Sequence, residues 1–139
     1  MPVNRSQVAI PSVYKAGGTH EDLKSALFRI LFGIETTWGL DQNDLAAILH
    51  RSPSTISVWK SQQAVSVAPS HPSPNDAQVF ELIEFFDSVT SLLIRTEDQI
   101  NWLRTTSPDF GGLSPLELLK LKPKNLYTLR EWVDRVARP

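Results

Sequence analysis

Apolar side chains recur along this chain at intervals of three and four residues, which is the period of one face of an α-helix. One apolar stripe covers residues 23–38 and predicts a helix over 20–38. Gly39 is predicted to end this helix, because glycine adopts the left-handed conformation of a helix terminus without strain. A second stripe covers residues 79–93, with acidic residues on the other faces, and predicts a long helix capped by Asp76.

Shorter helices are predicted where a capping residue precedes an apolar pattern. Asp41 caps a helix over 42–49, and Ser52, followed by Pro53 at the first helical position, opens another that ends near Lys60. Three further helices are predicted to start at Thr96 with Gln99, at the capping box Ser114-Pro115-Leu116-Glu117, and at Asn125. Since strand signals are weak throughout, we predict an all-α protein.

A stretch without charge or helical periodicity separates the two halves of the chain. Residues 61–75 contain three prolines and no Asp, Glu, Lys or Arg, which is typical of a connector. The predicted organisation is therefore a flexible arm at 1–18, a first helical unit at 19–61, a linker at 62–75 and a second helical unit at 76–139.

The composition, with 139 residues, 41% hydrophobic and 21% charged, is that of a soluble globular protein. No apolar run approaches the roughly 20 residues of a membrane span, and the first residues do not resemble a signal peptide. We therefore expect a cytoplasmic protein without membrane contact. The absence of cysteine excludes disulfides, thiolate metal sites and a cysteine nucleophile.

Catalytic chemistry is not expected. The three histidines, His20, His50 and His71, lie on separate predicted elements, and no pair of them has the spacing of metal ligands. No glycine-rich loop follows a strand, and helix caps and solvated faces explain the acidic residues. We predict no enzymatic activity, no cofactor and no metal.

The net charge of -1 is the sum of unlike segments. Residues 1–61 are close to neutral, residues 76–98 carry six acids and one base, and residues 120–139 carry six bases and two acids. The net charge excludes a strongly basic DNA-wrapping protein. The chain nevertheless has an acidic middle segment and a basic C-terminal segment.

The two short helices at 42–49 and 53–60, joined by a tight turn, match the plan of a helix-turn-helix. The string LDQNDLAAILHRSPSTISVWKSQ resembles the Xre-type helix-turn-helix, with His50 and Arg51 where the family has glycine and an apolar residue. His50 is expected to adopt the left-handed conformation at the turn.

Contact with operator DNA would involve both predicted helices and the turn between them. This surface has few cations, so a single copy is predicted to bind DNA weakly. A homodimer is therefore expected. The alternative is a protein-interaction module that kept this fold without binding DNA. The candidate residues are Gln42 and Ser52 at phosphates or helix ends, Ser54, Thr55 and Val58 at base edges, and Arg51 and Lys60 at flanking phosphates.

The stretch INWLRTTSPDFGGLSPLELLKLK resembles the toxin-binding domain of the Xre/MbcA/ParS family of type II antitoxins. Together with the helix-turn-helix, the resemblance covers residues 21–139. It implies that the C-terminal domain covers the active site of a RES-domain, NAD-consuming toxin, while the N-terminal domain represses the operon, within a larger complex of toxin and antitoxin. The runner-up is a stand-alone transcriptional regulator whose C-terminal domain serves dimerisation.

The basic C-terminus is the candidate surface for toxin contact. Arg130 and Arg135 are expected on the exposed side of the last helix, and as an alternative these cations pair with the acidic helix near residues 76–98 of the same molecule. The candidate toxin-binding residues are Arg130, Glu131, Asp134, Arg135, Arg138 and Pro139 with its carboxylate.

Overall fold

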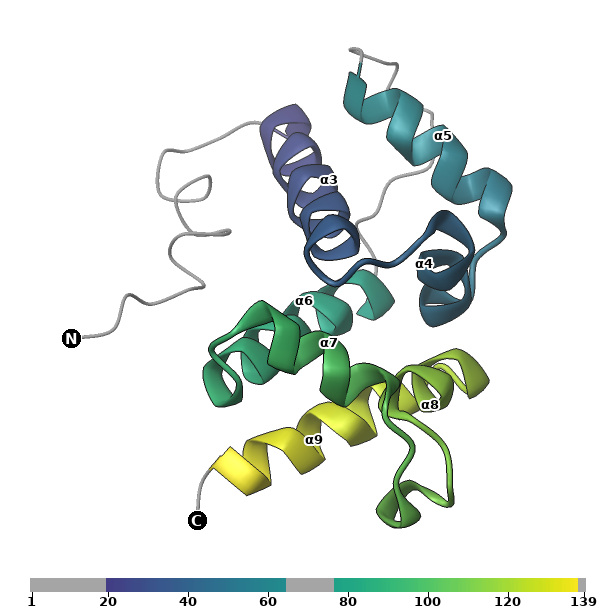
Figure 1. Ribbon diagram of the computed structural model, residues 1–139. Coiled ribbons are helices and arrows are strands. Elements are labelled where there is room, and N and C mark those ends of the chain that lie inside the picture. The colour runs from purple at the N-terminus through teal and green to yellow at the C-terminus, as the bar shows by residue number, and fades with distance from the viewer. Residues whose placement is uncertain (1–19, 65–76, 138–139) are drawn as a thin grey trace, which may run out of the picture.

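The computed structural model describes residues 20–64 and 77–137, with side chains described over 25–61 and 77–137 (Figure 1). These residues form helices and no β-strand, which confirms the predicted all-α class for this part of the chain. The elements are α3 (His20–Thr37), α4 (Gln42–Leu49), α5 (Pro53–Ala64), α6 (Ala77–Leu92), α7 (Thr96–Arg104), the 3-10 helix η1 (Pro108–Phe110), α8 (Pro115–Leu121) and α9 (Asn125–Ala137). No helix in the described ranges is long and apolar enough to cross a membrane.

The predicted arm at 1–18 and most of the predicted linker lie outside the described residues. The helix α5 continues to Ala64, past the predicted helix end near Lys60 and into the first three residues of 62–75. Two glutamines and an alanine follow Ser61, and all three favour continuation of a helix.

Capping explains where several helices begin and end. Asp41 and Asp44 form a reciprocal capping box at the start of α4, and Ser114 and Glu117 form another at the start of α8. His50 ends α4 in the left-handed conformation with φ of 55°, and its N–H donates to carbonyl groups in the last turn. The expectations for Asp41, Ser114 and His50 are confirmed.

Two predicted caps are wrong. Arg95, not Thr96, precedes α7, and it makes no side-chain capping bond. Gln99 does not bond back to the helix start, because its side chain is buried and turned into the core. Asn125 is the first residue of α9 and not the residue before it. Its side-chain amide donates to the carbonyl of Leu118 at 2.8 Å instead of capping the helix.

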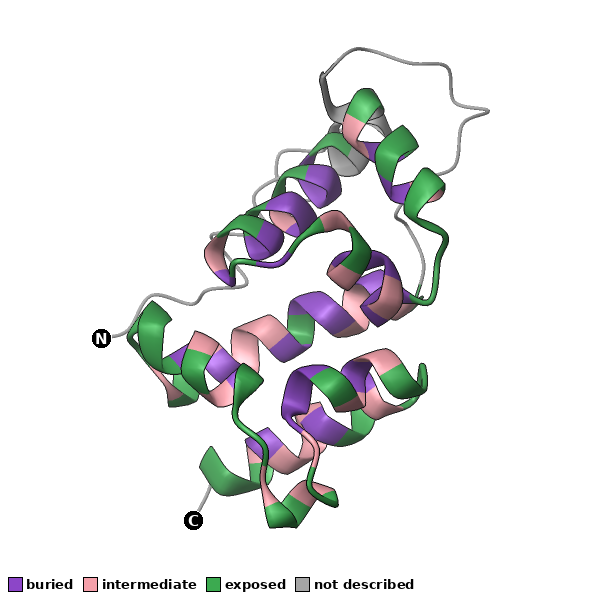
Figure 2. Cartoon of the chain, turned by 45° about the vertical axis from the view of Figure 1, so that its right-hand side comes forward, coloured by how far each residue is buried: buried purple, intermediate pink, exposed green. Residues whose placement is uncertain are grey.

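The core is continuous through both predicted units. The helix α6 lies in the middle and packs most extensively against α9, while α3 and α4 lie on its other side (Figure 1). The Trp38 ring meets Phe85 edge-on at 5.7 Å and Phe86 at 4.9 Å between ring centroids, which joins the end of α3 to α6. Buried residues accordingly line the inward sides of the helices in both halves (Figure 2).

Polar contacts fasten the two halves at their junction. The Gln78 amide of α6 donates to the carbonyl of Ile48 at 3.3 Å and to that of Pro123 at 3.0 Å. The Lys120 ammonium of α8 binds the Asp44 carboxylate of α4. These contacts place α4 in a fixed position against the C-terminal half.

A buried hydrogen-bond network holds α7 against the end of α3. Indole Nε1 of Trp38 donates to Oε1 of Gln99 at 2.9 Å, and Nε2 of Gln99 donates to the carbonyl of Leu93 at 2.7 Å. Both side chains are buried, so removal of Gln99 leaves the Trp38 indole N–H without a partner in the core.

Replacement of Gln99 by methionine is expected to lower the free energy of unfolding by about 1–3 kcal/mol, because Gln99→Met keeps the volume but leaves the Trp38 indole N–H and the Leu93 carbonyl unpaired. The control Asn101→Leu changes an exposed residue of the same helix and is expected to shift stability by about 0.5 kcal/mol or less. Urea unfolding followed by circular dichroism measures both. Equal midpoints for the two variants would contradict the role of the network.

Candidate functional site

The two short helices α4 and α5 pack against each other with a connection of three residues between them. Both helices contribute apolar side chains to the buried core, namely Leu45, Ala46 and Leu49 of α4 and Ile56 and Trp59 of α5. The buried residues of α5 lie on one side, which leaves its opposite side for solvent.

That solvent side of α5, here called the reading face, consists of Ser54, Ser57, Val58 and Ser61, all exposed. Ser54 and Val58 were predicted for it, whereas sequence reasoning missed Ser57 and Ser61. Ser57 and Ser61 lie three and seven residues after Ser54, so all three serines fall on one side of a helix. Helical periodicity could therefore have predicted these two residues. The face offers small hydroxyl groups and one aliphatic side chain.

Ser52 and Thr55 lie at the start of α5 and stabilise its first turn. Oγ of Ser52 accepts a hydrogen bond from the Thr55 backbone N–H at 3.1 Å, as predicted for an N-cap. The Ser52 hydroxyl also lies 2.9 Å from the Thr55 hydroxyl and 3.0 Å from that of Ser54. Gln42, from α4, donates to the carbonyl of Pro53 at 2.9 Å, so one N–H of its amide connects the two helices.

The two cations predicted to flank the DNA contact side chains of the protein itself. Nζ of Lys60 binds Oε2 of Glu35 at 3.0 Å, and Glu35 is only 8% exposed. The ammonium also lies 5.6 Å from the centre of the Phe32 ring. The Arg51 guanidinium lies 5.9 Å from the centre of the Trp59 ring. Both cations are therefore held against the first helical unit.

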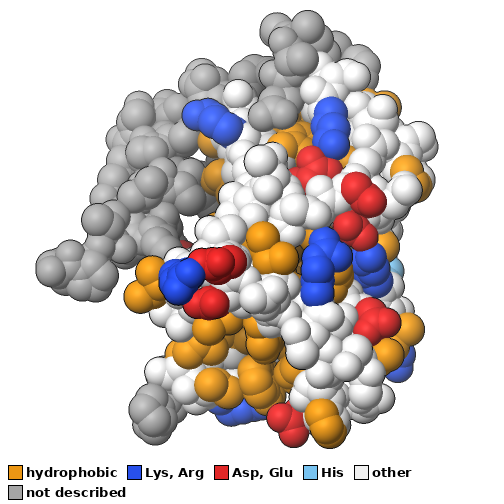
Figure 3. All heavy atoms as spheres, in the orientation of Figure 1, with side chains coloured by type: hydrophobic (Ala, Val, Ile, Leu, Met, Phe, Trp, Pro, Cys, Tyr) orange, Lys and Arg blue, Asp and Glu red, His pale blue; other side chains and the backbone are white. Residues whose placement is uncertain are grey.

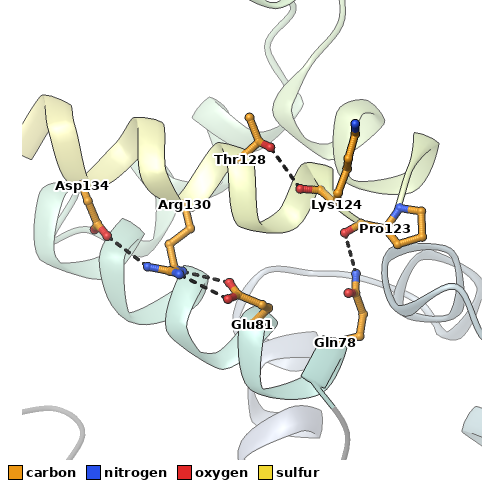
Figure 4. A network of polar contacts seen from close by, with 7 residues as sticks. All are labelled: Gln78, Glu81, Pro123, Lys124, Thr128, Arg130 and Asp134. Atoms are coloured by element: carbon orange, nitrogen blue, oxygen red, sulfur yellow. Dashed lines mark hydrogen bonds and ion pairs between the residues drawn. The ribbon is translucent and has the colours of Figure 1, made fainter.

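Arg130 differs from the expectation of an exposed cation at the C-terminus. It is half-buried, and its guanidinium binds the Glu81 carboxylate through Nε at 2.9 Å and Nη2 at 3.2 Å (Figure 4). Its Nη1 donates to Asp134 on the next turn at 3.4 Å. The hydrogen bonds that Arg130 donates to Glu81 raise the pKa of Arg130 above its usual value. The alternative prediction, that cations of the last helix pair with the acidic helix, is confirmed for this residue.

The other predicted toxin-binding residues are distributed unevenly. Arg135 is exposed, and Glu131 and Asp134 are half-buried. Arg138 and Pro139 lie outside the described residues. Among the described candidates on α9, Arg135 therefore presents the most accessible charge.

A groove of about 310 Å³ lies beside α9, between this helix, η1 and α8. The Trp132 ring forms part of its wall and meets Phe110 edge-on at 5.1 Å between ring centroids. Gly111 and Gly112 follow η1 with positive φ of 66° and 83°, which glycine adopts without strain. Sequence reasoning missed the groove, because three elements form it together. Its lining residues are Asp109, Phe110, Leu118, Asn125, Thr128, Leu129, Trp132 and Arg135.

Asp44 is the titratable group with a lowered pKa at the junction of the two halves. Partial burial alone would raise its pKa, but the hydrogen bond from Lys120 and that from the Asp41 backbone amide, together with the positive charges of Lys120 and Arg104, lower it overall. The ionised carboxylate is therefore favoured in the folded protein.

No family model matches the chain, and no curated protein matches it either. Within the described ranges, no group of three or more His, Asp or Glu side chains is arranged to hold a metal ion.

The lowered pKa of Asp44 predicts a pH dependence of stability. Its contribution is complete above the usual value of 3.8 and is lost as pH falls through the lower pKa of the folded state. We expect the difference in unfolding free energy between wild type and Asp44→Asn to be constant above about pH 5 and to shrink below about pH 4. Lys120→Met, which removes the partner, should reduce the same difference. A gap between wild type and Asp44→Asn that stays constant down to about pH 2 would contradict this assignment.

Proposed function

We propose that this protein is a DNA-binding antitoxin of a type II toxin-antitoxin system. In this proposal, α4 and α5 bind operator DNA and repress the operon. The C-terminal half neutralises a RES-domain, NAD-consuming toxin by covering its active site, and both activities belong to the cytoplasm. The sequence resemblance described above supplies the family and the partner.

The observation that best supports two separate binding functions is the placement of the two candidate surfaces. The helix α5 and the end of α9 lie at opposite ends of the molecule in both views (Figures 1 and 2). One continuous core joins them. A DNA duplex at α5 would therefore leave α9 accessible to a protein partner.

Recognition of DNA would use the reading face. Serine hydroxyls can donate hydrogen bonds to phosphate oxygens and can donate to or accept from base edges, and Val58 can contact a thymine methyl group. The cations Lys60 and Arg51 are close but already contact Glu35 and Trp59. The phosphate contribution to affinity is therefore small, which favours operator binding by more than one copy.

Recognition of the toxin would use the solvent side of α9 and the tail that follows it. Arg135 and Arg138 are cations, and a site built for NAD must accommodate the negative pyrophosphate of that cofactor. Arg130 contributes less directly, because Glu81 and Asp134 occupy its guanidinium. The ion pair of Arg130 with Glu81 holds α9 against α6 and so positions the neighbouring residues of α9.

A stand-alone regulator with a C-terminal dimerisation domain is the second candidate function. It shares the DNA-binding surface but has no toxin partner. The adjacent reading frame distinguishes the two, since an antitoxin is expected beside a gene for a RES-domain protein whose expression stops growth.

The first test concerns the reading face. We expect Ser54→Glu to weaken binding to the chain's own promoter fragment by about tenfold or more, equivalent to about 1.4 kcal/mol, because it places a negative charge against the phosphates. The matched control is Ser25→Glu, which makes the same change in net charge on the exposed side of α3. Fluorescence anisotropy at one fixed salt concentration measures both. Equal weakening by the two variants would remove the assignment to α5.

The second test concerns the partner. Truncation of α9 is unsuitable, since Leu126, Leu129 and Val133 of this helix are buried in the core. We expect the double variant Glu131→Lys/Arg138→Glu to lose rescue of growth when the adjacent gene product is co-expressed, because one negative and one positive charge of the proposed contact surface are reversed while the net charge is unchanged.

The control for this test is the double variant Arg95→Glu/Glu97→Lys, which exchanges the members of an exposed ion pair far from α9 in sequence. It keeps the net charge and should rescue growth like wild type. Growth and co-purification are read together. Rescue by both double variants would contradict toxin contact at these residues, and absence of a toxic neighbour would favour the stand-alone regulator.

A further inference from the structure

The connection between α8 and α9, here called the basic loop, consists of Lys122, Pro123 and Lys124, all exposed. Neither ammonium group of this loop forms an ion pair or a hydrogen bond with a described residue. Lys120 and Arg130, on either side of the loop, are by contrast paired within the chain. The basic loop therefore presents two positive charges that the described residues leave without a counter-ion.

Helix stability does not explain both of these lysines. Lys122 follows α8 as its C-cap, where a cation is favourable at the negative end of the helix dipole. Lys124 directly precedes α9, where the dipole is positive, and no acidic residue in the first turn of α9 offsets its charge. A cation at this end lowers the stability of the helix, so helix capping gives no reason for a lysine at position 124.

The basic loop is fastened beside the connection between α4 and α5. The Gln78 amide donates to the carbonyl of Pro123 and also to that of Ile48, in the last turn of α4. The helices α4 and α8 pack against each other and lie on one side of the molecule (Figure 1). Lys and Arg side chains lie over this side in the space-filling view of Figure 3. The Lys124 side chain extends away from Gln78 and α6 (Figure 4).

We propose that the basic loop binds the phosphate backbone of duplex DNA beside the segment that α5 reads. This contact rests on the proposed DNA binding by α4 and α5. In helix-turn-helix proteins the second helix lies in the major groove and the first helix crosses the sugar–phosphate backbone. A loop fastened to the end of α4 therefore lies along the path of that backbone. Lysine ammonium groups bind phosphates as point charges and do not read the base sequence.

The basic loop supplies charge that the reading face lacks. The two cations nearest that face, Lys60 and Arg51, already contact Glu35 and Trp59. The reading face itself carries hydroxyl and aliphatic side chains. Each phosphate that a cation neutralises releases a counterion, so two lysines steepen the dependence of log K on log salt concentration by about two. The C-terminal half thus contributes affinity for DNA, while α5 contributes the contacts to bases.

The test measures affinity for the chain's own promoter fragment and for a random duplex of equal length, by fluorescence anisotropy over a range of salt concentrations. We expect Lys122→Gln/Lys124→Gln to weaken binding to both duplexes by about tenfold or more at about 0.1 M salt. The same variant should make the slope of log K against log salt shallower by about two. Lys122→Arg/Lys124→Arg keeps both charges and should keep the wild-type slope.

The matched control is Arg95→Gln/Arg135→Gln, which removes two exposed cations and so makes the same change in net charge. These residues belong to the turn before α7 and to the end of α9, on the opposite side of the molecule from α4 and α8 (Figure 1). The control should keep the wild-type slope. Urea unfolding followed by circular dichroism checks the fold, and Lys124→Gln should not lower the midpoint, because it removes an unfavourable charge from the start of α9.

The outcomes separate this contact from the proposed function. An unchanged slope in the glutamine variant, or an equal loss in the control, would overturn the contact and leave DNA binding by α5 intact. A loss confined to the basic loop, together with full binding by Ser54→Glu, would support the contact and remove the assignment of the reading face. A wild type that binds neither duplex would overturn both the contact and the proposed DNA binding.

Discussion

The structure depends on the burial of α6, which is apolar on more sides than one neighbouring helix can cover. Val79, Leu82, Phe85 and Val89 are almost completely buried, and Phe80 and Phe86 are partly buried against the same core. A helix of this kind is stable in water only if other helices surround it. The helix α9 covers one side, and α3 and α4 cover the other. The N-terminal and C-terminal halves are therefore joined through one hydrophobic core.

This shared core explains why the polar contacts at the junction are satisfied within the chain. Packing α4 against α8 partly removes Asp44 and Lys120 from water, and their ion pair offsets that loss of hydration. Gln78 performs a similar role for carbonyl groups at the ends of α4 and α8, through two bonds from one amide. A displacement of α8 or α9 would have to break these bonds or move α4 as well.

The sequence predicted the helices well, because periodicity and capping are local properties. Asp41, His50 and Ser114 lie where their conformational preferences placed them. Side-chain partners were less predictable. Glu81 and Arg130 are 49 residues apart, and only the packing of α6 on α9 brings them together.

The partner of Gln99 was also unpredictable from the sequence, because it is distant along the chain. The position of Gln99 three residues after Thr96 suits a local capping bond. Its side chain instead accepts a hydrogen bond from the buried Trp38 indole N–H. Lys60 likewise was predicted for phosphates, yet Glu35 lies within reach only because α3 packs against α5. The groove beside α9 could not be predicted either, since its walls come from η1, α8 and α9 and its shape depends on their relative placement.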